Sequence, residues 1–259
     1  MKKSFPVDII MTTNTQKLHY SAWVYSSAIS LRLLSPLSEY IHDLPSLPLS
    51  AELCIAACGY AFNPVLFPCW PVLVYASSIF FVCERRQLLS SNEYLSKNDG
   101  LRYHHRIMAL NNAALYVVSV LTTLLVTEIC KAIFATTRPS KPQSASQYHN
   151  RRKYEHLITS LKSKHSFPSG DTAQAMNLCM ILCRYVIPSS CDSSSSTAAV
   201  GMPLINSIRN VFLFGMFLPG VAFARVYYRC HWIEDCLGGM LLSLILHSTL
   251  IPIIESRMF

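Results

Sequence analysis

Long apolar segments in the second half of the chain constrain its fold more than any other feature of the sequence. Each is close to the length of about 20 residues at which an α-helix crosses the hydrocarbon core of a bilayer. The sequence therefore predicts an all-α, polytopic membrane helix bundle. The segments run from about Ala113 to Ile129, from just after Ser169 to about Ile187, from Val211 to about Tyr228 and from Cys236 to about Ile254.

The composition favours a membrane protein over a soluble domain. Of the 259 residues, 51% are hydrophobic and only 14% are charged, and a chain of this length suits one bundle of about five or six spans. The net charge of +8 is spread over the loops. Because no basic patch with interleaved aromatic residues stands apart from the apolar segments, we expect a membrane protein that binds no nucleic acid.

The first half of the chain is less regular. Residues 18–43 mix aromatic, aliphatic and charged side chains, which predicts a helix lying at the membrane interface. The uncharged block from Leu53 to Cys83 is interrupted near its centre by Asn63 and Pro64, which predicts a tight hairpin. We therefore divide the chain into a polar N-terminus with an interfacial helix (1–48) and a transmembrane domain (49–259).

Hydropathy places three polar motifs at one membrane face. The first follows the span that ends near Ile129, and the second precedes the next span. The third lies at the turn between the last two spans, so all three reach the same side if each segment crosses once. The motifs are Lys131-x6-Arg138-Pro139, Pro168-Ser169-Gly170-Asp171 and Arg225-x5-His231-x3-Asp235.

The residue types in these motifs suit a phosphate-binding site. Lys131 and Arg138 would share one face of a continuing helix, and an arginine adds a planar, bidentate donor. Ser169 and Gly170 precede an apolar helical run from Thr172 to Ile187, so the free N–H groups and the positive end of the helix dipole can face an anion, while the serine hydroxyl can donate as well. The motifs together predict that a phosphate is held by cations and a helix start.

His231 and Asp235 have the spacing of an oriented catalytic histidine. At i,i+4 the carboxylate can accept a hydrogen bond from one imidazole nitrogen and leave the other free as a nucleophile or base. Glu128, one turn before Lys131, is expected to pair with that lysine. Elsewhere we expect a hydrogen-bonded core role for His247 and interfacial positions for the aromatic residues Tyr227, Tyr228 and Trp232.

These motifs resemble the type 2 phosphatidic acid phosphatase superfamily of membrane lipid-phosphate phosphatases. The family pattern is K-x6-R-P, P-S-G-H and S-R-x5-H-x3-D, and the resemblance covers roughly residues 110–255. It implies that His231 attacks phosphorus to form a phosphohistidine and that Asp235 orients it. Within the superfamily, the local sequence around Ser166-Phe167-Pro168 is most similar to the polyisoprenoid and presqualene diphosphate phosphatase branch. The residues implied to hold the phosphate are Lys131, Arg138, Ser169, Gly170 and Arg225.

Two residues depart from the family pattern. Ala224 replaces a serine, and Asp171 replaces the histidine that protonates the leaving group in the family. Asp171 is therefore the candidate general acid, and the change leaves a catalytically silent lipid-phosphate-binding protein as one alternative. A vanadate-dependent haloperoxidase is a second alternative, which is disfavoured because those relatives are soluble whereas this site adjoins membrane spans.

No metal ion or cofactor is expected. Three cations and a helix start provide the charge stabilisation that a divalent ion would otherwise give. The cysteines fall mostly inside apolar segments without a C-x2-C pair, which favours buried thiols over a zinc or disulfide framework.

The expected partners are a lipid phosphate substrate and the membrane, and the oligomeric state is left open. The resemblance implies a multi-pass protein of the endoplasmic reticulum or another endomembrane, with its site on the lumenal or external side. The positive-inside rule opposes this orientation, since five Lys/Arg lie in 84–106 and seven lie in 138–164.

Overall fold

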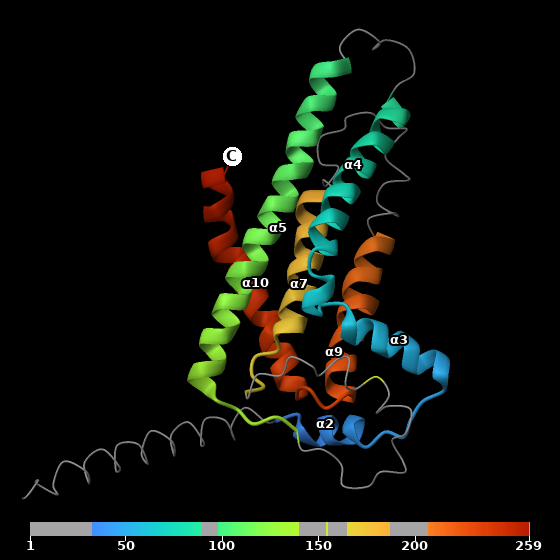
Figure 1. Cartoon of the computed structure of the whole chain (residues 1–259), viewed down its shortest axis with the longest axis vertical. Helices are drawn as coiled ribbons and strands as arrows, with labels where there is room; N and C mark the ends of the chain where they lie inside the picture. The colour runs from blue at the N-terminus through green and yellow to red at the C-terminus, as the bar shows by residue number, and fades with distance from the viewer. Residues whose placement is uncertain (1–32, 90–97, 140–153, 155–164, 187–206, 259) are drawn as a thin grey trace, which may run out of the picture.

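The computed structural model of the chain describes residues 33–89, 98–139, 154, 165–186 and 207–258. Within these ranges the secondary structure is helical, apart from an isolated β-bridge between Thr137 and His165. The bundle is formed by α4 (Cys69–Leu89), α5 (Asn98–Phe134), α7 (Gly170–Ile181) with its π-helical extension η2 (Leu182–Val186), the π-helical η3 (Val211–Phe217) leading into α9 (Leu218–Tyr227), and α10 (Ile233–Met258). Figure 1 shows these helices side by side.

Three helices are long and apolar enough to cross a membrane, namely Arg106–Phe134, Ser207–Tyr227 and Ile233–Arg257. The outer face of α5 carries exposed aliphatic side chains every fourth residue, at Leu121, Leu125, Ile129 and Ile133. Residues at this spacing lie on one helix face. An exposed aliphatic stripe along a long apolar helix is suited to contact lipid, so the all-α transmembrane bundle predicted from the sequence is confirmed.

α7 lies at the centre of the bundle, where it packs against α5, α9 and α10. Most of its side chains are buried, including the small residues Ala173 and Ala175. Small residues also line the facing side of α10: a Cβ on Gly239 would collide with the Ser169 carbonyl oxygen, and one on Gly238 with the Phe167 ring. Gly239 lets the two backbones approach closely, as in other membrane helix pairs, and Gly238 leaves room for the Phe167 ring.

The predicted hairpin over Leu53–Cys83 has unequal arms. Its first arm is α3 (Leu49–Tyr60), which has 12 residues and is therefore only about 18 Å long. After the short 3₁₀ helix η1 (Pro64–Leu66), the second arm is α4, which has 21 residues and packs along α5. α3 instead packs against α9 at a steep angle to the bundle (Figure 1). The block therefore supplies one bundle helix and one short helix beside it.

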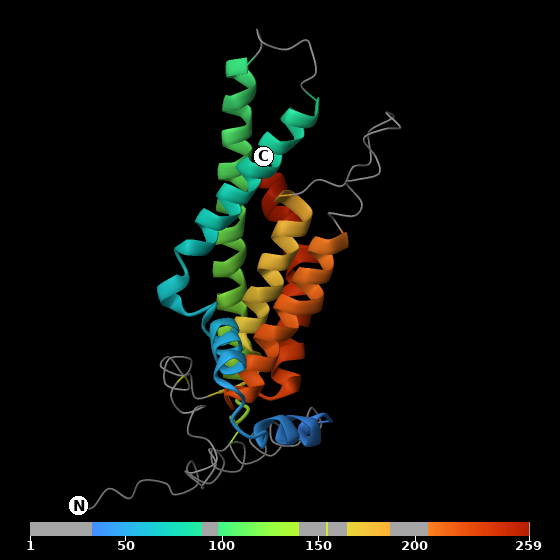
Figure 2. The same cartoon turned by 90° about the vertical axis from the view of Figure 1, so that its right-hand side faces the viewer.

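Part of the segment predicted to form an interfacial helix is helical, and its position relative to a membrane stays a prediction. α2 (Ser35–His42) lies across the end of the bundle, beneath α9 and α10 (Figures 1 and 2). The Ser38 hydroxyl accepts a hydrogen bond from the backbone N–H of Ile233, the first residue of α10. The first part of the predicted helix, residues 18–32, lies outside the described residues.

Candidate active site

The three predicted motifs meet at one end of the bundle. They lie at the end of α5, at the start of α7 and at the turn between α9 and α10, all close to α2 (Figure 1). Each segment alone is an ordinary helix end, and the antiparallel order of the helices brings the ends together. The sequence-based expectation that the motifs converge is therefore confirmed.

Backbone hydrogen bonds fix the relative positions of the connecting loops. The Ser166 N–H donates to the Thr136 carbonyl (3.0 Å), and the Ser169 N–H donates to the Asp235 carbonyl (2.8 Å). The Arg138 guanidinium also donates to the carbonyl of Cys230 (2.7 Å). The loop after α5, the start of α7 and the start of α10 are thus held as one unit.

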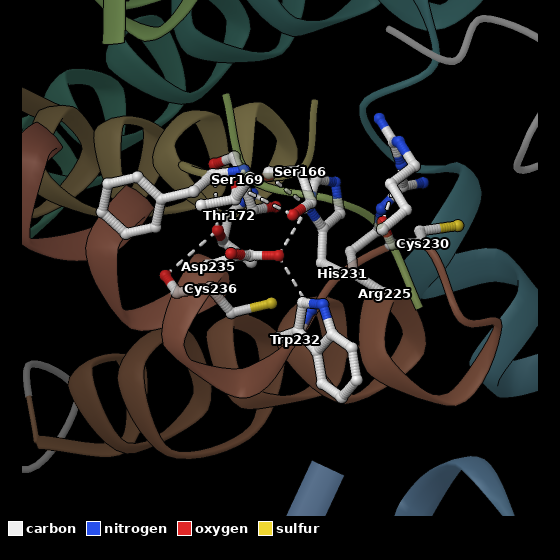
Figure 3. A network of polar contacts seen from close by, with 12 residues as sticks. Ser166, Ser169, Thr172, Arg225, Cys230, His231, Trp232, Asp235 and Cys236 are labelled. Atoms are coloured by element: carbon white, nitrogen blue, oxygen red, sulfur yellow. Dashed lines mark hydrogen bonds and ion pairs between the residues drawn. The ribbon is translucent and has the colours of Figure 1, made fainter. Parts of the chain in front are cut away.

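His231 is almost completely buried and has a defined tautomer. Its Nδ1 lies 2.8 Å from the carbonyl oxygen of Ser166 (Figure 3). Since a carbonyl only accepts, Nδ1 must carry the proton, and the neutral ring then keeps its lone pair on Nε2. The imidazole is accordingly presented with Nε2 as its nucleophilic atom.

Asp235 is close to His231 without being its nearest partner. Its Oδ2 lies 3.7 Å from His231 Nδ1, which is too long for a hydrogen bond, and it accepts a bond from the backbone N–H of Trp232 (2.9 Å). Ser166, to which sequence reasoning gave no role in the site, provides the bond instead. The acceptor is a backbone carbonyl, which every residue has, so the amino-acid sequence could not predict this bond.

The surroundings of His231 favour its neutral form. Burial lowers the pKa of the imidazole, and the nearby cations Arg225 and Arg138 lower it further, while Asp235 opposes this change. Desolvation is the largest of these influences because a buried ring loses the hydration of its charged form. A neutral His231 is the form that can attack an electrophile.

The predicted cations surround the same space. Lys131 is paired with Glu128, as expected, at 2.6 Å. Arg225 is buried and forms an ion pair with Asp171 at 2.8 Å, and it also donates to the Gly59 carbonyl of α3 (3.4 Å). The residue that departs from the family pattern is therefore bonded directly to one of the proposed phosphate-binding arginines.

A cavity of about 370 Å³ opens between these residues. One part of its lining is polar and contains most of the predicted site residues: Lys131, Arg138, Gly170, Asp171, Arg225 and His231. The remainder is mainly apolar, with Phe62, Phe67 and Trp70 from the α3–α4 region and Tyr116, Val120, Leu121 and Leu124 from α5. Such a cavity has the dual character of a site for an amphiphile with an anionic head.

Ser169 and Gly170 have different places at the start of α7. A Cβ on Gly170 would lie 4.0 Å from Lys131 Nζ and would thus extend toward the polar part of the cavity. Ser169 is fully buried and does not line the cavity; its hydroxyl accepts from the Thr172 N–H at 3.5 Å, as a helix N-cap. The glycine therefore keeps the cradle open, while the serine sets the helix start behind it.

Comparison with known proteins agrees with the motifs. The PAP2 superfamily profile matches residues 112–258. The chain belongs to the PAP2 superfamily. It is also similar to the crystal structure of the first transmembrane PAP2-type phosphatidylglycerolphosphate phosphatase from Bacillus subtilis, with a TM-score of 0.52 and 14% identity over 93% of this chain and 96% of that one. A comparison with curated protein sequences found no match.

Membership of the superfamily confirms the resemblance first drawn from the motifs. The three helices long enough to cross a membrane and the similarity to a transmembrane PAP2 structure identify the chain as an integral membrane protein. The match with the solved structure extends over most of the chain and shows that the helices before residue 112 also follow a transmembrane PAP2 fold.

Proposed function

We propose that this protein hydrolyses the phosphate or diphosphate ester of a lipid through a phosphohistidine on His231, without a metal ion. The cavity carries the proposal: its polar part holds three cations and His231, whose Nδ1 is bonded to the Ser166 carbonyl, and its remaining lining is suited to a lipid tail. A phosphate there would be stabilised as negative charge develops on its oxygens.

In the proposed reaction, His231 Nε2 attacks phosphorus and the P–O bond to the leaving oxygen breaks, which is the ester bond of a monoester or the anhydride bond of a diphosphate. The leaving oxygen takes a proton, for which Asp171 is the candidate donor, and water then cleaves the phosphohistidine to release inorganic phosphate. Lys131, Arg138, Arg225 and the N–H groups at Gly170 hold the phosphate oxygens. Ser169 supports this site as the helix cap, and Asp235 acts on His231 electrostatically.

The substrate class includes isoprenoid diphosphates. A second phosphate leaves with less protonation than an alkoxide does, so a diphosphate suits an enzyme whose acid is a carboxyl in an ion pair. We also propose that the protein belongs to the polyisoprenoid and presqualene diphosphate phosphatase branch. We place it in the endoplasmic reticulum or another endomembrane as part of the same proposal.

Turnover of lipid phosphates by the purified protein in detergent, with chelator present, tests the proposal. His231→Ala is expected to reduce turnover by on the order of a thousandfold or more while the protein stays folded. Arg138→Ala should cost on the order of a hundredfold, whereas the control Arg184→Ala, which removes a half-exposed arginine paired with Glu255, should cost little. Acid-labile phosphate on the wild type, and none on His231→Ala, would identify the intermediate.

The Asp171–Arg225 ion pair also favours a second candidate, a lipid-phosphate-binding protein without catalysis. The carboxylate occupies a guanidinium that the substrate phosphate would need. Lipid-phosphate binding with no turnover of any monoester or diphosphate would select this second function.

A further inference from the structure

Glu52 is a buried carboxylate to which the proposed reaction gives no role. It lies on α3 and has no exposed surface. Its Oε1 accepts hydrogen bonds from the backbone N–H of Leu47 (3.0 Å) and from the Tyr227 hydroxyl, and its Oε2 accepts one from the Tyr228 hydroxyl (3.2 Å). These three donors are neutral, and a carboxylate held by neutral donors is costly to bury. The contact therefore calls for a reason other than the filling of the core.

The two tyrosines lie between two residues of the proposed site. Tyr227 ends α9 and Tyr228 follows it, so they come two and three residues after Arg225 and four and three residues before His231. Their buried rings meet edge to face, with centroids 5.2 Å apart. Because the hydroxyl of each ring is bonded to Glu52, the carboxylate fixes how the end of α9 lies against α3.

Backbone hydrogen bonds connect this end of α9 to the proposed nucleophile. The Arg225 carbonyl accepts from the N–H groups of both Cys230 (2.9 Å) and His231 (3.2 Å). Arg225 is tied to α3 a second time, because its guanidinium donates to the Gly59 carbonyl (3.4 Å). A shift of the end of α9 relative to α3 would therefore move Arg225 and the backbone of His231 together.

We propose that Glu52 is a positioning residue: through Tyr227 and Tyr228 it holds the end of α9 so that Arg225 and His231 face the phosphate. The inference rests on the proposed function of the site. It makes α3 part of the framework that positions the site, although α3 precedes the residues matched by the superfamily profile. A displacement of about 1 Å at a reacting group can slow a reaction by about a hundredfold, so the loss of one buried bond should be measurable.

Glu52→Gln tests the inference. It keeps the size of the side chain but replaces one acceptor oxygen by an NH₂ group, which cannot accept from a tyrosine hydroxyl. The substrate is farnesyl diphosphate or an oleoyl glycerol phosphate, whichever the wild type hydrolyses faster. We expect kcat to fall about tenfold and competitive inhibition by inorganic phosphate to weaken about threefold, because both the reacting group and a phosphate ligand are displaced.

Ser119→Ala is the matched control for a loss of stability alone. It removes a buried hydroxyl that is bonded to Asn177 between α5 and α7 and that does not line the cavity. All rates are measured on monodisperse protein well below the melting temperature of each variant. Ser119→Ala should lower the melting temperature and leave kcat unchanged, whereas Glu52→Gln should lower kcat at temperatures where the protein is folded.

A double variant shows whether Glu52 acts through a tyrosine. Tyr228→Phe keeps the ring and deletes only the hydroxyl bonded to Glu52, so it should also lower kcat, and it tests the contact even if Glu52→Gln does not fold. If the two residues act through one contact, the combined variant should be no slower than the slower single variant. A wild-type kcat in the folded single variants, or a combined effect equal to the product of the single effects, would overturn the inference.

Binding of inorganic phosphate, measured by calorimetry, separates this inference from the proposed function. Weaker phosphate binding by Glu52→Gln than by the wild type, in a protein that hydrolyses no lipid phosphate, would support the role of Glu52 and contradict catalysis. Turnover by the wild type, with the same kcat and phosphate affinity in Glu52→Gln, would support catalysis and contradict the role of Glu52.

Discussion

The side chain at position 171 determines how the proposed phosphate cage behaves. The Asp171 carboxylate holds Arg225 at 2.8 Å, so a phosphate that binds Arg225 must either displace the carboxylate or lie beside it. Two neighbouring anions repel each other, and a proton on the carboxyl would relieve that repulsion. That proton is the one that the leaving group needs, which links phosphate binding to the proposed acid.

Asp171→Asn is therefore expected to have opposite effects on binding and on catalysis. Removal of the negative charge frees Arg225 for phosphate and should strengthen competitive inhibition by inorganic phosphate. The same change removes the proton donor and should slow substrates with alkoxide leaving groups by on the order of a hundredfold, but activated phenyl phosphates much less. Equal slowing of both substrate types would show that Asp171 only shapes the helix start, and Asp171→His should restore the rate on alkyl esters.

His231 leads to a prediction about pH. In the proposed reaction it attacks as the neutral imidazole, so kcat/KM should fall as the pH drops through its pKa, and burial lowers that pKa. Because the Asp235 carboxylate raises the pKa, Asp235→Asn should lower it further and move the acid limb of the kcat/KM profile to lower pH. The asparagine oxygen can still accept from Trp232 N–H. A limb that moved to higher pH would contradict this arrangement, and comparison with the wild type cancels the ionisation of the substrate.

At the scale of helices, the close contact of α7 with α10 positions the site. The Thr172 hydroxyl lies within hydrogen-bonding distance of two carbonyl oxygens, that of Ser169 at 3.1 Å and that of Cys236 at 3.2 Å. Farther along the two helices, Asn177 Oδ1 accepts from His247 and from Ser119 of α5. The hydrogen-bonded core role predicted for His247 is thus confirmed, and this contact holds the bundle together beneath the catalytic end.

Gly239→Ala tests the importance of this contact. A Cβ there would meet the Ser169 carbonyl and Thr172 Oγ1, so the start of α7 must shift, with a loss of about 1–3 kcal/mol in stability and a reduced turnover. Gly215→Ala is the matched control, because its Cβ would lie 3.8 Å from a Val211 methyl group in ordinary contact. That variant should be neutral or slightly stabilised, since alanine favours helices. Similar melting temperatures and rates for both variants would argue against a close packing requirement.

The helices show which parts of the site the sequence can predict. Hydropathy and the order of the motifs were enough to bring Lys131, Arg225 and His231 to one end, because long apolar segments must cross in alternate directions. The interfacial positions expected for Tyr227 and Tyr228 are wrong: both are fully buried, and both hydroxyls donate to the Glu52 carboxylate. That cluster depends on the packing of α3 against α9, which no local pattern encodes.

At the scale of the whole molecule, the polar lining of the cavity and its Phe62, Phe67 and Trp70 lining come from different parts of the chain. The superfamily match covers 112–258 and contains the phosphate-binding motifs. The aromatic part of the cavity precedes it, where Phe62 stacks on Trp70 with ring centroids 5.2 Å apart. The sequence of this region has no clear periodicity and did not predict the aromatic cluster.

The number of membrane spans can be determined from the side of the membrane on which single introduced cysteines are labelled. α3 has 12 residues and reaches about 18 Å, short of a hydrocarbon core of about 30 Å, so it should not cross. Between α2 and the end of α10 the chain would then cross in α4, α5, α7 together with its extension η2, η3–α9 and α10. This odd number of crossings places exposed Glu39 on the side of the active site and exposed Ser256 on the opposite side.

Single cysteines at these two positions, in a background without reactive native thiols, test the topology in sealed vesicles with a membrane-impermeant maleimide. Glu39→Cys and Ser256→Cys are expected to label from opposite faces. If α3 also crossed, the number of crossings would be even and both cysteines would label from one face. That outcome would also require α3 to leave its position beside α9, where the Gly59 carbonyl accepts a hydrogen bond from Arg225. The same experiment therefore tests whether α3 forms part of the wall of the proposed phosphate site.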